Sequence, residues 1–314
     1  MSSLPPVSVL GGGAFGRGIA LAAARNGRDV LLWSRSAREI DHPNVRTTTE
    51  LSDARASELA FVAVPSPFVA RVAEQLAPHL DGRHYLVHVS RGLIGEELTP
   101  ITRVLRQMTP AHRVGALAGP LAVSALSGGT PSGAIVGTRF PEVTDAVRDA
   151  IGSSALRVYA TKDVVGVEVA SAMVGLLALT VGYAQGMNVS GAALSVFLTR
   201  AMAEAVRLSP TLGVADPQTL YGLAGFGDLI AVVAGDERPE VLLGRALAGG
   251  TSLEDAGKAA GAHIEGVSIA RRLAAHAERL RLNAPITQAI VEVLEGGSAS
   301  DAYQALMARR VGSE

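Results

Sequence analysis

The chain has 314 residues and a formal net charge of −1 at pH 7, so it has no broad field that would favour nucleic acid or an anionic membrane. Its hydrophobic fraction of 48% and charged fraction of 18% support large buried cores, exclude a disordered chain and suit two domains at this length. The chain has no cysteine, which excludes disulfides, thiolate chemistry and cysteine-based metal sites, and no metal site is expected.

A dinucleotide-binding fingerprint opens the chain. Residues 7–10 form a short apolar run typical of a buried strand, and it ends in the pattern G-x-G-x-x-G at Gly11, Gly13 and Gly16. An Ala-rich segment at 14–26 then predicts a helix. Gly11 permits a tight turn, Gly13 lets the backbone approach a pyrophosphate, and Gly16 lets the helix pack closely on the strand. We therefore expect nucleotide binding, the alternative being a plain glycine turn in an α/β domain.

The second predicted strand, at 28–33, ends where such folds choose their cofactor. An Asp or Glu there would bind the adenosine ribose and repel a 2′-phosphate, but this chain has Ser34 and Arg35. A hydroxyl beside a guanidinium suits a 2′-phosphate, because arginine forms charge-assisted bidentate hydrogen bonds. The sequence therefore favours NADP(H) over NAD(H). The alternative is that Arg35 is a solvated loop charge that stacks on the adenine.

Strands and helices alternate through the rest of the first half. Further strands are predicted at 59–64, 85–89, 114–118, 134–137 and 156–159, with helices at about 65–80 and 96–108. This alternation implies a parallel sheet with helices on both faces, and ligands then bind beyond the carboxyl ends of the strands. The turns expected to border one crevice are those at Gly11, Ser34, Val64, Ser90 and Gly119.

Strand signals end at about residue 163. Helices are predicted near 164–187, 192–208, 216–223, 238–248, 264–280 and 286–295. The predicted fold class is α/β, a Rossmann-type doubly wound parallel sheet with an all-helical C-terminal domain. We expect a dinucleotide-binding domain at 1–162 and a helical substrate and dimerisation domain at 163–314.

The segment 169–199 carries no Asp, Glu, Lys or Arg and is long enough to span a membrane. Glycines and polar residues interrupt it, so a central helix buried on all sides is the preferred interpretation, with a membrane span as the alternative. The first residues lack a basic segment before a long apolar core, so no secretory signal is expected. We expect a cytoplasmic homodimer that acts on a small molecule.

The order and spacing of eleven short motifs indicate the family that this chain resembles. They lie at 9–16, 24–27, 30–33, 63–66, 90–93, 118–120, 157–159, 166–168, 224–229, 264–266 and 284–287. In order and spacing they resemble the bacterial NAD(P)-dependent glycerol-3-phosphate dehydrogenase family, along nearly the full length. The resemblance implies hydride exchange between a nicotinamide and C2 of glycerol 3-phosphate or dihydroxyacetone phosphate, as in glycerophospholipid metabolism.

The resemblance also implies which residues form the site. Cofactor-binding residues would be Gly11, Gly13, Ala14, Phe15, Gly16, Ser34, Arg35, Pro65, Arg91, Val123 and Glu265. Substrate-binding residues would be Gly119, Leu121, Asp228 and Arg238. The candidates for catalysis are Arg91, Asp228 and His263. His263 is included because its loop should border the crevice and a histidine can act as acid or base near neutral pH.

The chain departs from the family at the chemical centre. Val174 and Gly175 stand where the family carries a Lys-Asn pair, and valine can neither donate a proton nor stabilise an alkoxide. Arg91 replaces a second lysine; it keeps the charge, but its guanidinium is a poor proton shuttle. Residues 238–240, Arg-Pro-Glu, replace a phosphate-gripping Ser-Arg-Asn, and the glutamate would repel phosphate. Loss of a general acid costs roughly 10²–10⁴-fold in rate.

Two functions therefore stay open. One is an NAD(P)-dependent oxidoreductase with a degenerate active site, which transfers hydride between NADPH and dihydroxyacetone phosphate or a related 2-oxo or 2-hydroxy compound. The other is a catalytically inactive NADP(H)-binding sensor, regulator or scaffold, beside a third possibility of an inert structural homologue. His88, inside a predicted strand, is interpreted as a hydrogen-bonded core histidine rather than a catalytic one.

Overall fold

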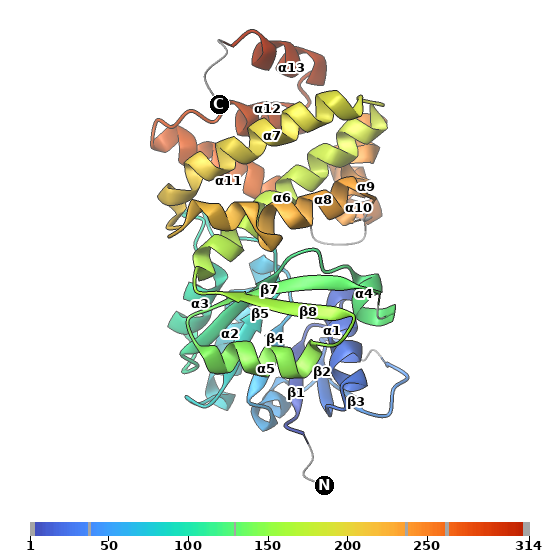
Figure 1. Ribbon diagram of the computed structural model, residues 1–314, viewed down its shortest axis with the longest axis vertical. Coiled ribbons are helices and arrows are strands. Elements are labelled where there is room, and N and C mark those ends of the chain that lie inside the picture. The colour runs from blue at the N-terminus through green and yellow to red at the C-terminus, as the bar shows by residue number, and fades with distance from the viewer. Residues whose placement is uncertain (1–3, 37–38, 129, 236–237, 261–263, 310–314) are drawn as a thin grey trace.

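The computed structural model describes residues 4–36, 39–128, 130–235, 238–260 and 264–309 (Figure 1). The first half forms one sheet with the strand order β3-β2-β1-β4-β5-β6-β7-β8. The strands are β1 Val7–Leu10, β2 Val30–Trp33, β3 Val45–Thr48, β4 Leu59–Val62, β5 Tyr85–His88, β6 Arg113–Ala118, β7 Ser132–Thr138 and β8 Leu156–Thr161. Short apolar runs rich in β-branched residues explain why the central strands form, since both of their faces are buried.

Helices cover both faces of this sheet. They are α1 Ala14–Arg25, α2 Ser66–Leu76, α3 Ile101–Met108, α4 Val123–Gly128 and α5 Pro141–Ile151, with 3₁₀ turns η1 Leu51–Ala56 and η2 Ala77–His79. Ile19 of α1, Leu126 of α4 and Val147 of α5 belong to the core on one face. Val69 of α2 and Leu105 of α3 belong to the core on the other. This is the layered arrangement expected of a doubly wound sheet.

After β8 every described element is helical. The elements are α6 Val164–Gly186, α7 Gly191–Leu208, η3 Ser209–Leu212, η4 Pro217–Tyr221, the π-helical η5 Leu223–Gly227, α8 Asp228–Val233, α9 Pro239–Ala248, α10 Leu253–Ala260, α11 Glu265–Arg279, α12 Pro285–Leu294 and α13 Ala299–Met307. In Figure 1 these helices form a second layer above the sheet, and α6 rises from the sheet into their centre.

Helix α6 is the core of the helical half. Among the described residues it is the one helix long and apolar enough to cross a membrane, yet 83% of its most apolar window is buried inside the structure. Met173, Val174 and Leu177 pack in a single core with side chains from α7, α8, α9, α11 and α12. Burial on all sides therefore accounts for its lack of charge, as the sequence predicts.

The structure corrects several predicted elements. The predicted all-parallel sheet is wrong at one pair, because β7 runs antiparallel to β6. The predicted helix at 96–108 begins only at Ile101, since Leu98 has a positive φ of 51° and Ile94 bridges Thr99. The predicted helix at 216–223 is replaced by η4 and the start of η5. Elements that were not predicted are β3, α4, α5, α8, α10 and α13.

Candidate active site

Five strands end at the same edge of the sheet. Because β2, β1, β4, β5 and β6 are mutually parallel, the turns after Leu10, Trp33, Val62, His88 and Ala118 share that edge. The chain leaves β1 outward through β2 and β3 and returns to the other side of β1 through β4. Such a reversal of strand order opens the crevice in which doubly wound folds bind ligands. The structure therefore confirms that these turns share one edge of the sheet.

The glycine turn after β1 has the geometry that a dinucleotide requires. Gly11 has a φ of 136°, and a side chain there would overlap the Ala63 carbonyl. A side chain at Gly16 would overlap the carbonyl of Gly11, so α1 packs against the turn itself. A Cβ at Gly13, by contrast, would have no neighbour within 4 Å. The turn thus keeps open space in front of the first amides of α1, which begins at Ala14 and Phe15, and these amides can receive a pyrophosphate.

Arg35 lies just beyond the end of β2. The preceding Ser34 amide donates to the Thr48 carbonyl at 3.0 Å, which continues the β2–β3 pairing. The Arg35 guanidinium carbon lies 5.4 Å from the centre of the Phe68 ring, on the exposed part of α2. This stacking holds a positive charge at the end of β2, where doubly wound folds bind the adenosine ribose.

Asp228 is a buried carboxylate held between two arginines. It opens α8 and is 0% exposed. One Arg91 nitrogen lies 2.5 Å from its Oδ2, and Arg238 donates to Oδ1 at 2.7 Å and to Oδ2 at 3.2 Å. The Arg238 side chain is almost buried, whereas that of Arg91 is 22% exposed. Of the two arginines that bind Asp228, Arg91 is the more accessible.

Glu265 joins two turns of the crevice edge from the helical side. Its Oε1 accepts the Ser66 amide at 2.8 Å, so it caps α2 directly after Pro65. Its Oε2 is buried and has no hydrogen-bond partner among the described residues, and a side chain at Gly92 would overlap it. Glu265 therefore lies between the turn after β4 and the turn that carries Arg91. An unpaired buried carboxylate oxygen is a position that can accept a hydrogen bond from a bound ligand.

Val174 and Gly175, which the sequence resemblance matches to the family's Lys-Asn pair, lie within α6. Val174 is 0% exposed and belongs to the helical core. A Cβ at the neighbouring Gly175 would meet nothing within 4 Å, although the residue itself is buried. The Gly175 carbonyl lies against Gly266 at the start of α11, so α6 and α11 approach closely here.

The turn after β6 holds the remaining predicted contacts. Gly119 has a φ of 112°, and Leu121 donates its amide to the Gly119 carbonyl at 2.7 Å. The Leu121 side chain is buried in the sheet core, so only its backbone is available to a ligand. Val123 opens α4 and its side chain is exposed. His263, the predicted acid or base, lies outside the described residues.

Two buried glutamates were not predicted as structural groups. Glu168 of α6 accepts the Thr102 amide at 2.9 Å and the Thr102 hydroxyl at 2.6 Å, and His88 lies 3.0 Å from the same carboxylate. His88 is therefore a hydrogen-bonded core histidine, as predicted. The Gly-Val-Glu motif at 166–168 marked Glu168 in the sequence, but nothing there indicated its partners.

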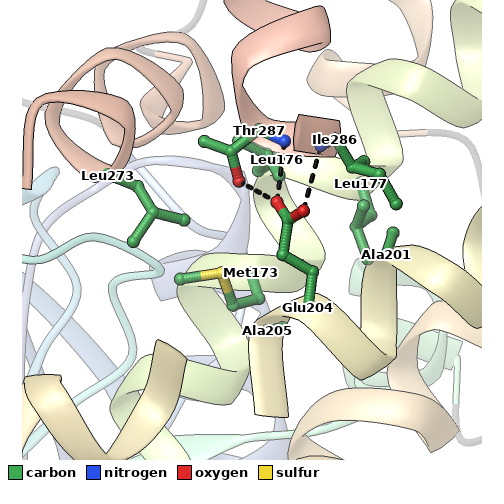
Figure 2. Close-up of a pocket in the computed structure, with 9 residues that line it drawn as sticks. All are labelled: Met173, Leu176, Leu177, Ala201, Glu204, Ala205, Leu273, Ile286 and Thr287. Atoms are coloured by element: carbon green, nitrogen blue, oxygen red, sulfur yellow. Dashed lines mark hydrogen bonds between the residues drawn. The ribbon is translucent and has the colours of Figure 1, made fainter. Parts of the chain in front are cut away.

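Glu204 of α7 has a similar role within the helical half, and Figure 2 shows its carboxylate pointing at the start of α12. It accepts the Ile286 amide at 3.0 Å, the Thr287 amide at 2.8 Å and the Thr287 hydroxyl at 2.7 Å. The cavity beside it has a volume of about 10 Å³, which is room for one water molecule and not for a substrate. The Glu204 carboxylate therefore binds groups inside the helical half.

Comparisons with known proteins agree with this architecture. The protein-family model for the NAD-dependent glycerol-3-phosphate dehydrogenase N-terminus matches residues 6–50 and 40–143. The family model for the C-terminus of the same enzyme matches residues 163–304. The glycerol-3-phosphate dehydrogenase [NAD(P)+] of Ectopseudomonas mendocina is 31% identical over 98% of this chain and 95% of its own. That of Maricaulis maris is 31% identical over 98% of both chains.

Solved structures show the same fold. The glycerol-3-phosphate dehydrogenase of Coxiella burnetii superimposes with a TM-score of 0.90 at 23% identity, over 98% of this chain and 100% of the other. The glycerol-3-phosphate dehydrogenase of Plasmodium falciparum superimposes with a TM-score of 0.88 at 13% identity, over 98% of this chain and 97% of the other. The family models and curated relatives extend over nearly the whole chain. The chain therefore belongs to the NAD(P)-dependent glycerol-3-phosphate dehydrogenase family.

Proposed function

We propose that this protein uses NADPH to reduce the ketone of dihydroxyacetone phosphate or a closely related small 2-oxo compound, and catalyses the reverse oxidation. The observation that carries this proposal is the convergence of Arg91, Arg238 and Asp228 at the crevice edge. Its relatives bear the name glycerol-3-phosphate dehydrogenase [NAD(P)+], and nothing favours the alternative of an inactive sensor or scaffold.

The cofactor would lie along the glycine turn. The open space at Gly13 and the free amides of α1 suit its pyrophosphate, and the stacked Arg35 suits a 2′-phosphate. Glu265 would accept a hydrogen bond through its unpaired Oε2. When bound, the nicotinamide supplies or accepts the hydride. The preference for NADPH over NADH rests on Arg35 in place of an acidic residue.

Arg91 would act on the carbonyl oxygen in place of the family's lysine. Asp228 holds its guanidinium at one nitrogen, and the exposed remainder can stabilise the negative charge that develops on the oxygen. Because a guanidinium does not give up its proton, the proton comes from solvent. Arg238 neutralises Asp228 from the buried side, so that the carboxylate does not repel an anionic substrate. Gly119 and the Leu121 backbone would line the substrate side of the crevice.

The test follows NADPH oxidation by absorbance with dihydroxyacetone phosphate and a series of 2-oxo compounds with and without phosphate. We expect turnover by the wild type and a loss of roughly 10²–10³-fold in kcat/KM for Arg91→Gln. Arg91→Lys should retain more activity than Arg91→Gln, and Arg157→Gln, at an exposed position of β8, is the matched control. Full activity of Arg91→Gln would remove its role, and a wild type inert toward every 2-oxo compound would remove the substrate class.

Cofactor preference has its own test. Nicotinamide fluorescence would measure the Kd of NADPH and of NADH for the wild type and for Arg35→Ala. We expect tighter binding of NADPH and erosion of that preference by at least roughly ten-fold, equivalent to ~1.4 kcal/mol, in the variant. An unchanged preference would remove the role of Arg35 and leave the reaction itself untouched.

The proposal includes a homodimer in the cytoplasm, with residues 1–162 binding the cofactor and 163–314 completing the substrate site. Exposed apolar side chains where α6 passes into α7 support association through the helical half, namely those of Met187, Val189 and Val196. Light scattering after size exclusion would give the mass, and Val196→Asp should shift a dimer toward monomer. A wild type of single-chain mass at high concentration would contradict this part.

A further inference from the structure

A cleft of about 590 Å³ lies away from the crevice described above, between α3, the corner after β7 and the start of α6. His112 precedes β6, and Arg139 follows the antiparallel β7, so both lie at the sheet edge opposite the glycine turn. Thr102 and Val165 bring α3 and α6 together at this cleft. Its size falls within the range of small-molecule sites.

The cleft concentrates positive charge. Arg103 and Arg106 of α3 and Arg139 line it, together with His112 and Gln107, and its lining includes no aspartate or glutamate. All three arginine side chains belong to exposed residues, and the structure records no ion pair or hydrogen bond from them to any described residue. Three guanidinium groups around one hollow repel each other, and an anion placed between them would relieve that repulsion.

A neighbouring arginine shows that this lack of compensation is local. Arg113, one residue beyond His112, lies 3.8 Å from Glu142, donates to the Gly82 carbonyl at 2.6 Å and stacks on Tyr85. Its charge is therefore already balanced within the protein. The charges of Arg103, Arg106 and Arg139 are not balanced in this way.

Most of the remaining lining is apolar. Phe140, Val164, Val165 and Leu212 contribute side chains to the cleft beside the arginines. Arginine matches the oxygens of a phosphate by paired hydrogen bonds, and an apolar wall favours an organic group attached to it. We propose that this cleft is a second ligand site, separate from the nucleotide crevice, that binds a small organic phosphate.

The position of the cleft would let such a ligand join the two halves of the chain. Arg103 and Arg106 belong to the sheet half, while Val164 and Val165 open the long helix of the other half. Thr102 in the lining also binds Glu168, so the cleft adjoins a hydrogen-bonded link between α3 and α6.

Isothermal titration calorimetry with phenyl phosphate and inorganic phosphate tests the proposal. We expect phenyl phosphate to bind the wild type several-fold more tightly than inorganic phosphate, and Arg103→Gln/Arg106→Gln/Arg139→Gln to weaken it by at least roughly ten-fold. The matched control is Arg55→Gln/Arg157→Gln/Arg281→Gln, which removes the same charge from exposed positions outside the cleft and should change the Kd less than two-fold. Equal weakening by both triple variants, or no weakening by the first, would overturn the proposal.

A Gly13→Ala variant separates this site from the crevice. If Gly13→Ala abolishes phenyl phosphate binding and the cleft variant does not, the binding belongs to the glycine turn and the proposal is wrong. Retained binding by Gly13→Ala, together with weakened binding by the cleft variant, supports the cleft whether or not the enzyme reduces a 2-oxo compound.

The wild type offers a second measurement that does not depend on how a variant folds. Phenylglyoxal modifies accessible arginines, and mass spectrometry reports the extent at each residue. Phenyl phosphate should protect Arg103, Arg106 and Arg139 and leave Arg157 unprotected. Equal modification of the cleft arginines with and without phenyl phosphate would overturn the proposal.

Discussion

Arg91 and Asp228 are 137 residues apart in the chain, yet an Arg91 nitrogen and an Asp228 oxygen lie 2.5 Å apart. The first follows a strand of the sheet and the second opens a helix of the other half. Their pairing holds a cation beside the turns at the carboxyl ends of the strands, whereas Val174 in α6 is fully buried. Arg91, in the turn after β5, is therefore the partly exposed cation of this pair.

Removal of the Asp228 charge should destabilise the protein as well as inactivate it. Asp228→Asn leaves the buried Arg238 and the half-buried Arg91 without their shared counter-charge, and we expect a loss of about 3–5 kcal/mol in the free energy of unfolding. Urea denaturation followed by circular dichroism measures it. Asp145→Asn breaks an exposed pair with Arg148 and should cost less than about 0.5 kcal/mol. Equal costs for the two variants would contradict the role of burial.

Two glycines of the same turn should respond differently to alanine. Gly16→Ala places a methyl group against the Gly11 carbonyl, so we expect a lower melting temperature from roughly 1–3 kcal/mol of overpacking. Gly13→Ala meets no protein atom and should melt like the wild type, but its methyl group occupies space proposed for the pyrophosphate. NADPH titration should then show at least roughly ten-fold weaker binding, or ~1.4 kcal/mol. Normal NADPH binding by Gly13→Ala would argue against this placement.

The carboxylate of Glu204 should stabilise the start of α12. Glu204→Gln keeps the shape but loses the charge that accepts two amides and a hydroxyl, so we expect a loss of about 1–3 kcal/mol in unfolding free energy. Glu254→Gln, in an exposed pair with Lys258, provides the control and should lie within about 0.5 kcal/mol of the wild type. Urea denaturation measures both variants. Equal unfolding midpoints for Glu204→Gln and Glu254→Gln would contradict the prediction.

His276 should make stability depend on pH. Burial lowers the pKa of His276 from its usual 6.5, and the charge of Arg279 lowers it further. Arg279 donates to its Nδ1 and Thr211 lies 3.0 Å from Nε2, which fits a neutral ring that accepts at Nδ1 and donates at Nε2.

A lowered pKa in the folded state means that the unfolded chain binds more protons between the two pKa values. The contribution of His276 is therefore full above about pH 6.5 and is lost as the pH falls toward the folded-state pKa. Urea midpoints at pH 7.5 and pH 5.5 should differ less in His276→Gln than in the wild type. An identical pH dependence of the two proteins would show that other groups cause it.

The sequence predicts the sheet, the glycine turn and the long helices because their signals are local. The four-residue strand Val45–Thr48 was missed because it is a half-exposed edge strand with an Arg and two Thr, and it has no apolar alternation. The late start of α3 depends on the positive φ of Leu98. A leucine rarely adopts a positive φ, so the sequence does not indicate this conformation. The strand β7 was predicted, but its antiparallel direction was not, because strand direction depends on how the chain crosses the sheet.

The residues of the site could be predicted from local motifs, but the contacts between them could not. Arg91, Asp228 and Arg238 were each named from motifs, but their union in one ion-pair cluster is a tertiary contact that no spacing reveals. Glu204 was not predicted as a buried group, because its partners are the backbone amides of a helix that begins about 80 residues later. Local rules indicate which residues lie near a crevice and leave their partners open.

The first amides of helices α2 and α3 donate hydrogen bonds to carboxylates that are synthesised much later in the chain. Glu265 follows Ser66 by 199 residues, and Glu168 follows Thr102 by 66. While the first part of the chain emerges, the leading amides of both helices can be satisfied only by water. The sheet half therefore lacks these two helix-capping hydrogen bonds until the helical half has been synthesised. In a fragment that stops at residue 162, the first amides of α2 and α3 should exchange their hydrogens rapidly with solvent.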